Sequence, residues 1–357
     1  MVFKIVSEQG KARLGKLKTA HGIIETPFFM PVATKAAMKH LSKDDLDNTN
    51  AIITNTLLIS LKPGLEIISH FNGLHNFMSW DKVIFTDSGG FQVLSEFFYD
   101  KISESGFYFK SPYDGKVHLL TPERAIEIQN ALGSDVAMAL DDVPHHNSSR
   151  SISNCVKRTH EWAARCKEAH KNENQLLFGI TQGSIDKKLR VKSAKFINSL
   201  DFDGIALGGL GIREEKKAMY NMIDFSLPYL NKEKPRYLMG IGSPKEIINA
   251  VDHGIDIFDS CFPTRTARHG GLFTKNGRID ILRGIYAKDK SPIEKDCTCY
   301  FCKNFSKAYL RHLLKSEVPL AFRYVSIHNV HFIQEMMKEI RKSIKKNYFD
   351  DVKKEYK

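Results

Sequence analysis

The sequence predicts an α/β protein, a (β/α)₈ TIM barrel with a β-rich insertion and a cysteine-bearing C-terminal subdomain. Eight short apolar runs, each followed by a helix-like stretch, extend over about 260 residues, the usual size of such a barrel. The runs are nearly continuous in apolar residues, as parallel strands buried on both faces are. A doubly wound sheet is the competing fold. The number of units favours the barrel, as do polar residues at the strand ends, where barrel enzymes carry their chemistry.

The stretches between the predicted strands carry helix start and stop signals. Thr121-Pro-Glu123 places a cap residue, a first-turn proline and an acid ahead of a helix that ends at Gly133. Ser243-Pro-Lys-Glu246 is a capping-box pattern, and Gly254 ends that helix. Residues 100–120 are predicted to form the β-rich insertion. In chain order the predicted strands lie within residues 26–34, 51–56, 83–87, 136–142, 176–182, 204–210, 237–242 and 255–259.

The composition is that of a globular protein with a basic surplus. The 357 residues, 42% hydrophobic and 26% charged, are enough for a full core. A formal net charge of +12 favours a polyanionic partner such as nucleic acid. Because no run of 18 apolar residues and no signal-peptide core is present, we expect a soluble, cytoplasmic protein with no membrane partner.

Three of the six cysteines stand together near the C-terminus as Cys297-x-Cys299-x-x-Cys302. With His328 they offer three thiolates and one imidazole, a closed tetrahedral set for structural zinc. His312 and His331 are alternative fourth ligands, and a reduced cysteine cluster without metal is the competing interpretation. We therefore expect one structural Zn²⁺ per chain, in a zinc-binding subdomain of residues 291–357 whose C-terminal helix packs on a catalytic barrel of residues 1–290.

Polar residues follow several predicted strands. Asp259 leads into a loop that carries Arg265 and Arg268. Asp87 opens a glycine-containing turn, and Asp141-Asp142 follows another strand, although paired carboxylates are most often solvated turn residues. Singly, each of these also fits an ordinary turn. Together with Gln182 and the Gly208-Gly209-Leu210 backbone, they place acceptors, an amide and open N–H groups on one rim, which suits the edge of a purine-like base.

Several longer motifs give the chain a resemblance to the tRNA-guanine transglycosylases, from Pro27 to the C-terminal helix. They are Thr86-Asp-Ser-Gly-Gly-Phe-Gln92, Ser111-Pro-Tyr-Asp-Gly115, Gln129-Asn-Ala-Leu-Gly-Ser-Asp135, Leu140-Asp-Asp-Val143, Lys234-Pro-Arg-Tyr-Leu-Met-Gly240, Phe262-Pro-Thr-Arg-Thr-Ala-Arg268 and the cysteine cluster. The sequence of residues 140–143 and 262–268 resembles the eukaryotic queuine-inserting catalytic subunit more closely than the bacterial form. After Leu210 the chain reads Gly-Ile-Arg-Glu, which departs from both.

The resemblance implies that the wobble guanine of a tRNA anticodon is exchanged for a 7-deazaguanine base, queuine or its precursor. Asp259 would be the nucleophile that forms a covalent ribosyl-enzyme ester, and Asp87 the general acid/base. The implied base-binding residues are Asp87, Ser88, Gly89, Gly90, Phe91, Asp141, Gln182, Gly209, Leu210 and Met239. The implied RNA-binding residues are Gly240, Ile241, Gly242, Ser243, Pro244, Lys245, Glu246, Thr264, Arg265, Thr266, Ala267 and Arg268.

Two other functions compete with this one. The first is a non-catalytic RNA-binding subunit of the same fold. The presence of Asp87, Asp141 and Asp259 argues against it. The second is a barrel glycosidase acting on sugars, which the net charge, the zinc module and the scarcity of tryptophan disfavour. The expected partners are a tRNA with a wobble guanosine and, by resemblance, a second copy or a non-catalytic paralogue in a dimer. A basic predicted helix at residues 187–195, including Arg190, is a less specific RNA candidate, since such faces are most often only solvated.

Overall fold

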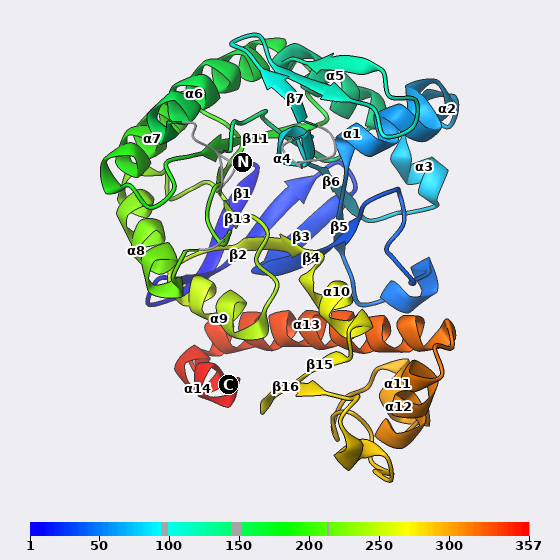
Figure 1. The fold of residues 1–357 in the computed structure, drawn as a ribbon. Coiled ribbons are helices and arrows are strands. Elements are labelled where there is room, and N and C mark those ends of the chain that lie inside the picture. The colour runs from blue at the N-terminus through cyan, green and yellow to red at the C-terminus, as the bar shows by residue number, and fades with distance from the viewer. Residues whose placement is uncertain (94–98, 144–150, 213, 357) are drawn as a thin grey trace.

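The computed structural model describes residues 1–93, 99–143, 151–212 and 214–356. Eight parallel strands form a closed barrel in which the last strand pairs with the first, with helices around the outside (Figure 1). This confirms the predicted (β/α)₈ fold, and each of the eight predicted runs overlaps one barrel strand. The barrel strands are β4 (Phe28–Ala33), β5 (Ala51–Thr54), β6 (Val83–Thr86), β10 (Val136–Met138), β11 (Leu176–Thr181), β12 (Gly204–Leu207), β13 (Arg236–Leu238) and β14 (Ile257–Ser260).

The strands are mostly apolar because both of their faces are buried. Phe28 and Met30 of β4 point into the barrel core, whereas Phe29 between them belongs to the outer core beneath the helices. In β5, Ile53 likewise belongs to the barrel core and Ile52 to the outer core. This period of two places alternate residues in two different cores, so no position in these strands is left to water.

The helices that follow the strands confirm some sequence signals and contradict one. Thr121 Oγ1 accepts the N–H of Arg124, and Gly133 closes that helix at φ +65°. The capping box at Ser243 is wrong, because Ser243 makes no side-chain cap bond and Glu246 instead pairs with Lys216. The helices around the barrel are α1 (Thr56–Ile59), α2 (Leu65–His70), α3 (Leu74–Met78), α4 (Gly90–Val93), α5 (Pro122–Leu132), α6 (Ile152–Ala169), α7 (Lys187–Ser199), α8 (Lys216–Ser226), α9 (Pro244–Asp252) and α10 (Phe262–Arg268). Short 3₁₀ turns lie at Lys43–Leu46, Leu227–Tyr229 and Gly284–Tyr286, and a π turn at Ser60–Gly64.

Among the described residues three antiparallel sheets lie outside the barrel, and two of them have three strands. The strands β1 (Phe3–Gln9), β2 (Ala12–Thr19) and β3 (Gly22–Thr26) send Phe3, Leu17 and Ile24 into the barrel core. They pack at the N-terminal ends of the barrel strands, where buried Arg13 pairs with Asp256. The second sheet, β7 (Tyr99–Ile102), β8 (Phe107–Lys110) and β9 (Val117–Leu120), confirms the predicted β-rich insertion.

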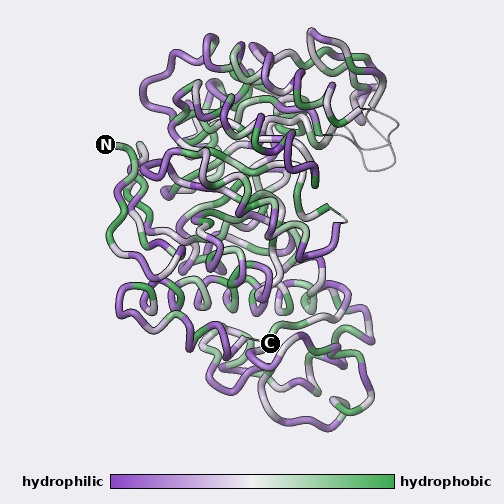
Figure 2. The backbone as a smooth tube through the Cα atoms, turned by 90° about the vertical axis from the view of Figure 1, so that its left-hand side faces the viewer, coloured by the Kyte–Doolittle hydropathy of each residue, from purple (hydrophilic) through white to green (hydrophobic). Residues whose placement is uncertain are grey.

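The C-terminal segments are joined to the barrel by one long helix, α13 (Leu320–Lys346), which lies between the two bodies in Figure 1. In Figure 2 the C-terminus is marked in the lower part of the molecule, away from the N-terminus. Its first half contributes to a separate small core, and its second half packs into the outer core of the barrel. Arg341 donates to Pro27 O at 2.7 Å, next to β4. The other elements are β15 (Gly271–Thr274), β16 (Gly277–Asp280), α11 (Tyr300–Asn304), α12 (Lys307–Lys315) and α14 (Phe349–Glu355). Among the helices of the described ranges, none has the length and apolarity needed to cross a membrane.

Candidate active site and metal centre

A cavity of about 510 Å³ opens at the C-terminal ends of the barrel strands. Its walls include Asp87, Asp141, Gly209, Met239 and Asp259, each from a different strand or the loop behind it. The structure therefore brings together the residues that the sequence placed on one rim. Strand-end residues converge in this way because the carboxyl ends of all eight parallel strands meet at one face.

Asp259 lies in β14 with its carboxylate facing this cavity. Its Oδ1 accepts the Tyr237 hydroxyl at 2.5 Å and the Gly240 N–H at 2.9 Å. Burial raises the pKa of Asp259, against these two hydrogen bonds, which lower it. Within the described residues both hydrogen bonds go to Oδ1, which leaves Oδ2 for chemistry.

Asp87 follows β6, and main-chain groups of the next loops orient it. Its Oδ1 accepts the N–H groups of Thr56 and Gly89, each at 3.0 Å, and its Oδ2 accepts Asn55 Nδ2 at 3.0 Å. Burial, with a smaller contribution from the charge of Asp259, raises the pKa of Asp87 to about 7, against these hydrogen bonds. A carboxyl group with that pKa can both donate and accept a proton near neutral pH.

Asp141 and Asp142 are both buried, with 4% and 0% exposure, so the solvated-turn interpretation of this pair is wrong. Asp142 is held beneath the site by Arg158, whose NH1 donates to it at 2.6 Å. Asp141 faces the cavity and accepts Gln182 Nε2 at 2.6 Å. Burial and the charge of Asp142 raise the pKa of Asp141 to about 7, against the hydrogen bond from Gln182.

The Gln182 side chain lies against the Gly208-Gly209 backbone. Its Nε2 is used by Asp141, whereas its Oε1 is buried and has no hydrogen-bond partner among the described residues. A Cβ on Gly208 would lie 2.6 Å from Gln182 Nε2, and one on Gly209 would clash with Oε1. Gly209 also has φ +65°, so glycine is required there for two reasons. An unpaired buried acceptor beside an open cavity marks the place of a ligand donor.

The cavity also has two apolar walls suited to a flat ring. Phe91, 59% exposed, and the partly buried Met239 both line it, together with Ser88 and Leu210. Gly89 and Gly90 pack behind the site, where a Cβ on Gly90 would lie 3.0 Å from Asp141 O. Ile241 fills the space that glycine leaves at position 211, where a Cβ would clash with it. The absence of a side chain at Gly211 therefore does not enlarge the cavity.

The segment after Asp259, expected to be a loop, is the helix α10. The helix begins at Phe262, and Pro263 lies in its first turn, where proline is tolerated, which explains the difference. Arg265 is exposed and lines the cavity, and Arg268 is partly buried with NH1 unpaired within the described residues. Thr266 and Ala267 of the implied RNA-binding set are buried, as is Ile241 before α9, whereas Lys245 is exposed.

Sequence reasoning missed three residues that shape the site. Tyr237 and Asn55 hold the two carboxylates. Asn55 stands near the end of a predicted strand, the signal that identified the aspartates, whereas Tyr237 lies inside β13 and carries no such signal. Arg190 was interpreted as part of a basic surface, which is wrong, because its side chain is fully buried behind the cavity.

The predicted metal ligands converge on one point of the C-terminal subdomain. The Sγ atoms of Cys297, Cys299 and Cys302 lie 3.7, 3.7 and 3.4 Å from His328 Nδ1. Tetrahedral zinc, with bonds of about 2.3 Å to sulfur and about 2.0 Å to nitrogen, requires about 3.6 Å between these atoms. His328 Nε2 donates to Phe273 O at 2.8 Å, which leaves the Nδ1 lone pair for a metal. His331 instead contacts Thr298 and Asn48, so His328 is the fourth member of the set.

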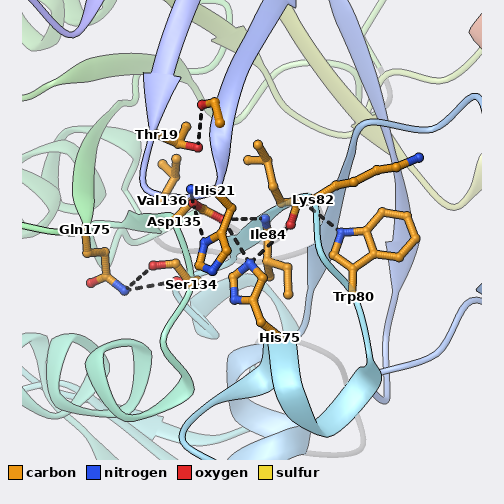
Figure 3. Close-up of polar contacts among 12 residues, drawn as sticks. Thr19, His21, His75, Trp80, Lys82, Ile84, Ser134, Asp135, Val136 and Gln175 are labelled. Carbon is orange, nitrogen blue, oxygen red and sulfur yellow. Dashed lines mark hydrogen bonds and ion pairs between the residues drawn. The ribbon is translucent and has the colours of Figure 1, made fainter.

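A second group of potential ligands, His21, His75 and Asp135, lies at the other end of the barrel (Figure 3). Its two imidazole rings are stacked at 3.5 Å with an interplanar angle of 12°. A bound metal lies close to the plane of each imidazole, so rings stacked in this way cannot share one ion. Asp135 instead accepts hydrogen bonds from both imidazole rings and from the main-chain N–H groups of His21 and Ile84. Burial alone would raise the pKa of Asp135, but the hydrogen bonds from His75, Ile84 and His21 lower it to about 2. This cluster ties the β2–β3 turn and α3 to the start of β10.

The fold and the cavity define a (β/α)₈-barrel protein with carboxylates at its C-terminal face and a Cys₃His group that could bind zinc. The model of the family described as queuine tRNA-ribosyltransferase matches residues 8–357, and the chain belongs to that family. Proteins named queuine tRNA-ribosyltransferase from Halothermothrix orenii and Thermoanaerobacter sp. are each 46% identical to it, over 94% and 97% of this chain and 91% and 93% of their own. The protein of that name from Fusobacterium nucleatum is 45% identical over 100% of this chain and 97% of its own. These relatives are bacterial, and the closer likeness to the eukaryotic subunit is not confirmed by them.

Proposed function

We propose that this protein is a tRNA-guanine transglycosylase, a pentosyltransferase that exchanges the wobble guanine of a tRNA for a 7-deazaguanine base. The observation that carries the proposal is that two carboxylates, those of Asp259 and Asp87, line one cavity of about 510 Å³. Each of the two accepts hydrogen bonds from a different set of donors. Family membership and the printed names of the relatives support the same activity. A non-catalytic subunit of this fold has no need for two such groups.

In the first half-reaction, Asp259 Oδ2 attacks the anomeric carbon of the wobble nucleoside. A carbon–oxygen bond forms, the glycosidic carbon–nitrogen bond breaks, and its electron pair leaves with guanine, which receives a proton from Asp87. The Tyr237 hydroxyl and the Gly240 N–H hold Oδ1 while Oδ2 reacts. The product is a covalent ribosyl-aspartate ester.

In the second half-reaction, the incoming base loses a ring N–H proton to Asp87 and its nitrogen attacks the same carbon. The ester bond to Asp259 breaks and the carboxylate is regenerated. Two displacements at one carbon retain its configuration, which is the outcome that a nucleophilic carboxylate and an acid/base carboxylate produce together. The pKa of Asp87, raised to about 7 by burial, suits a group that must act in both directions.

The base would be read along its edge by Asp141, Gln182 and the backbone of Gly209 and Leu210. Asp141 would accept hydrogen bonds from ring and amino N–H groups, and Gln182 Oε1, which has no partner among the described residues, would accept another. The Gly209 N–H would donate to the ring carbonyl oxygen, with Phe91 and Met239 on the two faces of the ring. Ser88, Gly89 and Gly90 shape the wall behind it.

The tRNA would lie over the face that carries Arg265 and Arg268, whose charges suit the phosphates beside the target nucleotide. The α9 N-terminus, reached through residues 240–246, adds N–H groups and the positive end of a helix dipole. The burial of Ile241, Thr266 and Ala267 indicates that their contribution is to hold these segments.

Zinc would be held by Cys297, Cys299, Cys302 and His328, one ion per chain. Four protein ligands leave no open position, so the metal would stabilise the subdomain of residues 291–357 and take no part in exchange. Queuine or its precursor as the base, and a dimer with a second copy or a paralogue, remain proposals that follow from the resemblance.

Exchange of labelled guanine in tRNA tests the function, with queuine and its aminomethyl precursor offered separately as replacements. Incubation with tRNA and no free base should give an adduct that survives denaturing electrophoresis. Asp259→Asn should abolish the adduct while tRNA binding persists. An adduct mapped by mass spectrometry to Asp87 or Asp141 would show that the assigned roles are wrong.

A further inference from the structure

Arg190 of α7 is a fully buried cation behind the base-binding cavity. Its guanidinium donates to three main-chain carbonyl oxygens, those of Ser184 at 2.9 Å, Thr181 at 3.3 Å and Gly208 at 2.6 Å. Burial lowers the pKa of Arg190 to about 9, against the nearby charge of Glu214, so the group remains charged at neutral pH. Burying a charge is costly unless its donors are used, and an apolar residue would fill the space with less penalty.

The three acceptors belong to two adjacent segments, residues 181–184, which carry Gln182, and residues 208–209, which line the cavity. Thr181 and Ser184 flank Gln182, and Gly208 N also donates to Thr181 O at 2.9 Å. A Cβ on Gly183 would lie 2.7 Å from Arg190 N, so this segment lies directly on the first turn of α7. One side chain therefore fixes both the loop that carries the Gln182 amide and the glycine pair beside it.

The contact with Gly208 also determines where the next N–H group points. The C=O and N–H of one trans peptide point in opposite directions, and the Gly208–Gly209 peptide is trans. Because Gly208 O is turned toward Arg190, the Gly209 N–H is turned away from it, to the side of the cavity that both glycines line. Gly209, at φ +65°, has no Cβ to restrict rotation of this peptide, so the contact with Arg190 supplies the restriction.

We propose that Arg190 is a positioning residue for base recognition: it aims the Gly209 N–H at the ring carbonyl oxygen of the bound base. The inference rests on the proposed function, since it requires a purine-like base in the cavity. It assigns Arg190 no contact with the substrate. Removing the guanidinium should release the Gly208–Gly209 peptide and weaken the one hydrogen bond that reads the carbonyl oxygen.

The test compares guanine with 6-thioguanine, in which a weakly accepting sulfur replaces that oxygen. Inhibition constants of both are measured against incorporation of a labelled 7-deazaguanine base into tRNA. In the wild-type protein guanine should bind about three- to tenfold more tightly, the range of a single neutral hydrogen bond. In Arg190→Lys, which keeps the charge and loses the planar fork, this ratio should approach one. The KM for the base should rise while the KM for tRNA stays unchanged.

Arg236→Lys is the matched control. Arg236 is another buried arginine, which donates to Gly254 O at 3.3 Å at the first residue of β13 and does not line the cavity. Its replacement should lower thermal stability as Arg190→Lys does, yet leave the guanine to 6-thioguanine ratio at the wild-type value. Arg190→Gln, a smaller donor, gives a second measurement if the lysine variant folds poorly.

A wild-type ratio in both Arg190 variants would overturn the inference, as would an equal change of the ratio in Arg236→Lys. Failure of the proposed function gives a different result, namely no exchange of guanine in tRNA by the wild-type protein. The two failures are therefore distinguishable in one set of assays.

Discussion

Replacing Tyr237 with phenylalanine should slow adduct formation at acidic pH and leave the barrel intact. The Tyr237 hydroxyl donates to Asp259 Oδ1 at 2.5 Å, and its ring packs edge-on against Phe85 in the barrel core. Phenylalanine keeps the ring and removes only the donor. Since that donor stabilises the ionised carboxylate, its loss raises the pKa of Asp259 beyond the rise that burial already causes.

The sign and size of the effect follow from the contact. Asp259 must be ionised to attack, so the rate is lost as pH falls through its folded-state pKa, and a higher pKa begins that loss at a higher pH. A hydrogen bond to a charged group contributes about 1.5–3 kcal/mol, which corresponds to a rate about ten- to a hundredfold lower on the acidic limb. Above the limb, where Asp259 is ionised in both proteins, the rates should agree within a few-fold, since the Gly240 N–H remains.

Single-turnover adduct formation with tRNA, followed by denaturing electrophoresis across a range of pH, measures this. Tyr220→Phe is the control, because Tyr220 is a half-buried tyrosine that stacks on His253 at 5.0 Å, on α8 outside the barrel. Its pH profile should match that of the wild-type protein. The reasoning is refuted if Tyr237→Phe leaves the acidic limb in place, or if it slows the reaction equally at every pH.

Three further outcomes are expected. Burial raises the pKa of Asp87 to about 7. Guanine release, which needs protonated Asp87, should therefore slow about tenfold per pH unit above that value, and base incorporation, which needs ionised Asp87, should slow below it. Rapid-quench rates that change with pH in the same direction for both steps would contradict this. Cys302→Ser should lower the zinc content measured by elemental analysis and the unfolding temperature, both relative to the wild-type protein. Cys261→Ser, which replaces an exposed cysteine outside the cluster, should leave both quantities unchanged. Gly209→Ala should weaken base binding by about 1 kcal/mol or more, from a left-handed backbone and a clash with Gln182, with tRNA binding unchanged in equilibrium titration; equal base affinity would show that the cavity tolerates the Cβ.

Local patterns in the sequence were sufficient for the barrel and for the metal cluster. Strands such as Ala51–Thr54 are apolar at most positions because residues on both faces pack into a core, and this pattern requires no knowledge of the neighbours. The spacing of Cys297, Cys299 and Cys302 is likewise local, and only the choice of His328 over His331 needed the structure.

What the sequence could not give is the partner of each polar side chain. Arg190 reads as one more basic residue in a lysine-rich helix, and only the fold turns it inward onto three carbonyl oxygens. Asp142 reads as half of a solvated pair until Arg158, 16 residues later, lies against it. The capping box predicted at Ser243 is wrong for the same reason. The Glu246 carboxylate forms an ion pair with Lys216 of another helix and not the hydrogen bond that a capping box requires.

The proposed division of roles between the two carboxylates depends on such distant partners. Burial raises both pKa values, so the shifts alone do not separate a nucleophile from an acid/base group. The donors do distinguish them. Asp87 is held through both oxygens by Asn55, Thr56 and Gly89, which keeps it in place through two opposite proton transfers. Within the part of the chain that the structure describes, Asp259 is held through Oδ1, by a tyrosine of the neighbouring strand and a loop N–H, and its other oxygen can reach a carbon atom. A nucleophile has to be oriented at one oxygen and unencumbered at the other, and of these two groups Asp259 is the one built that way.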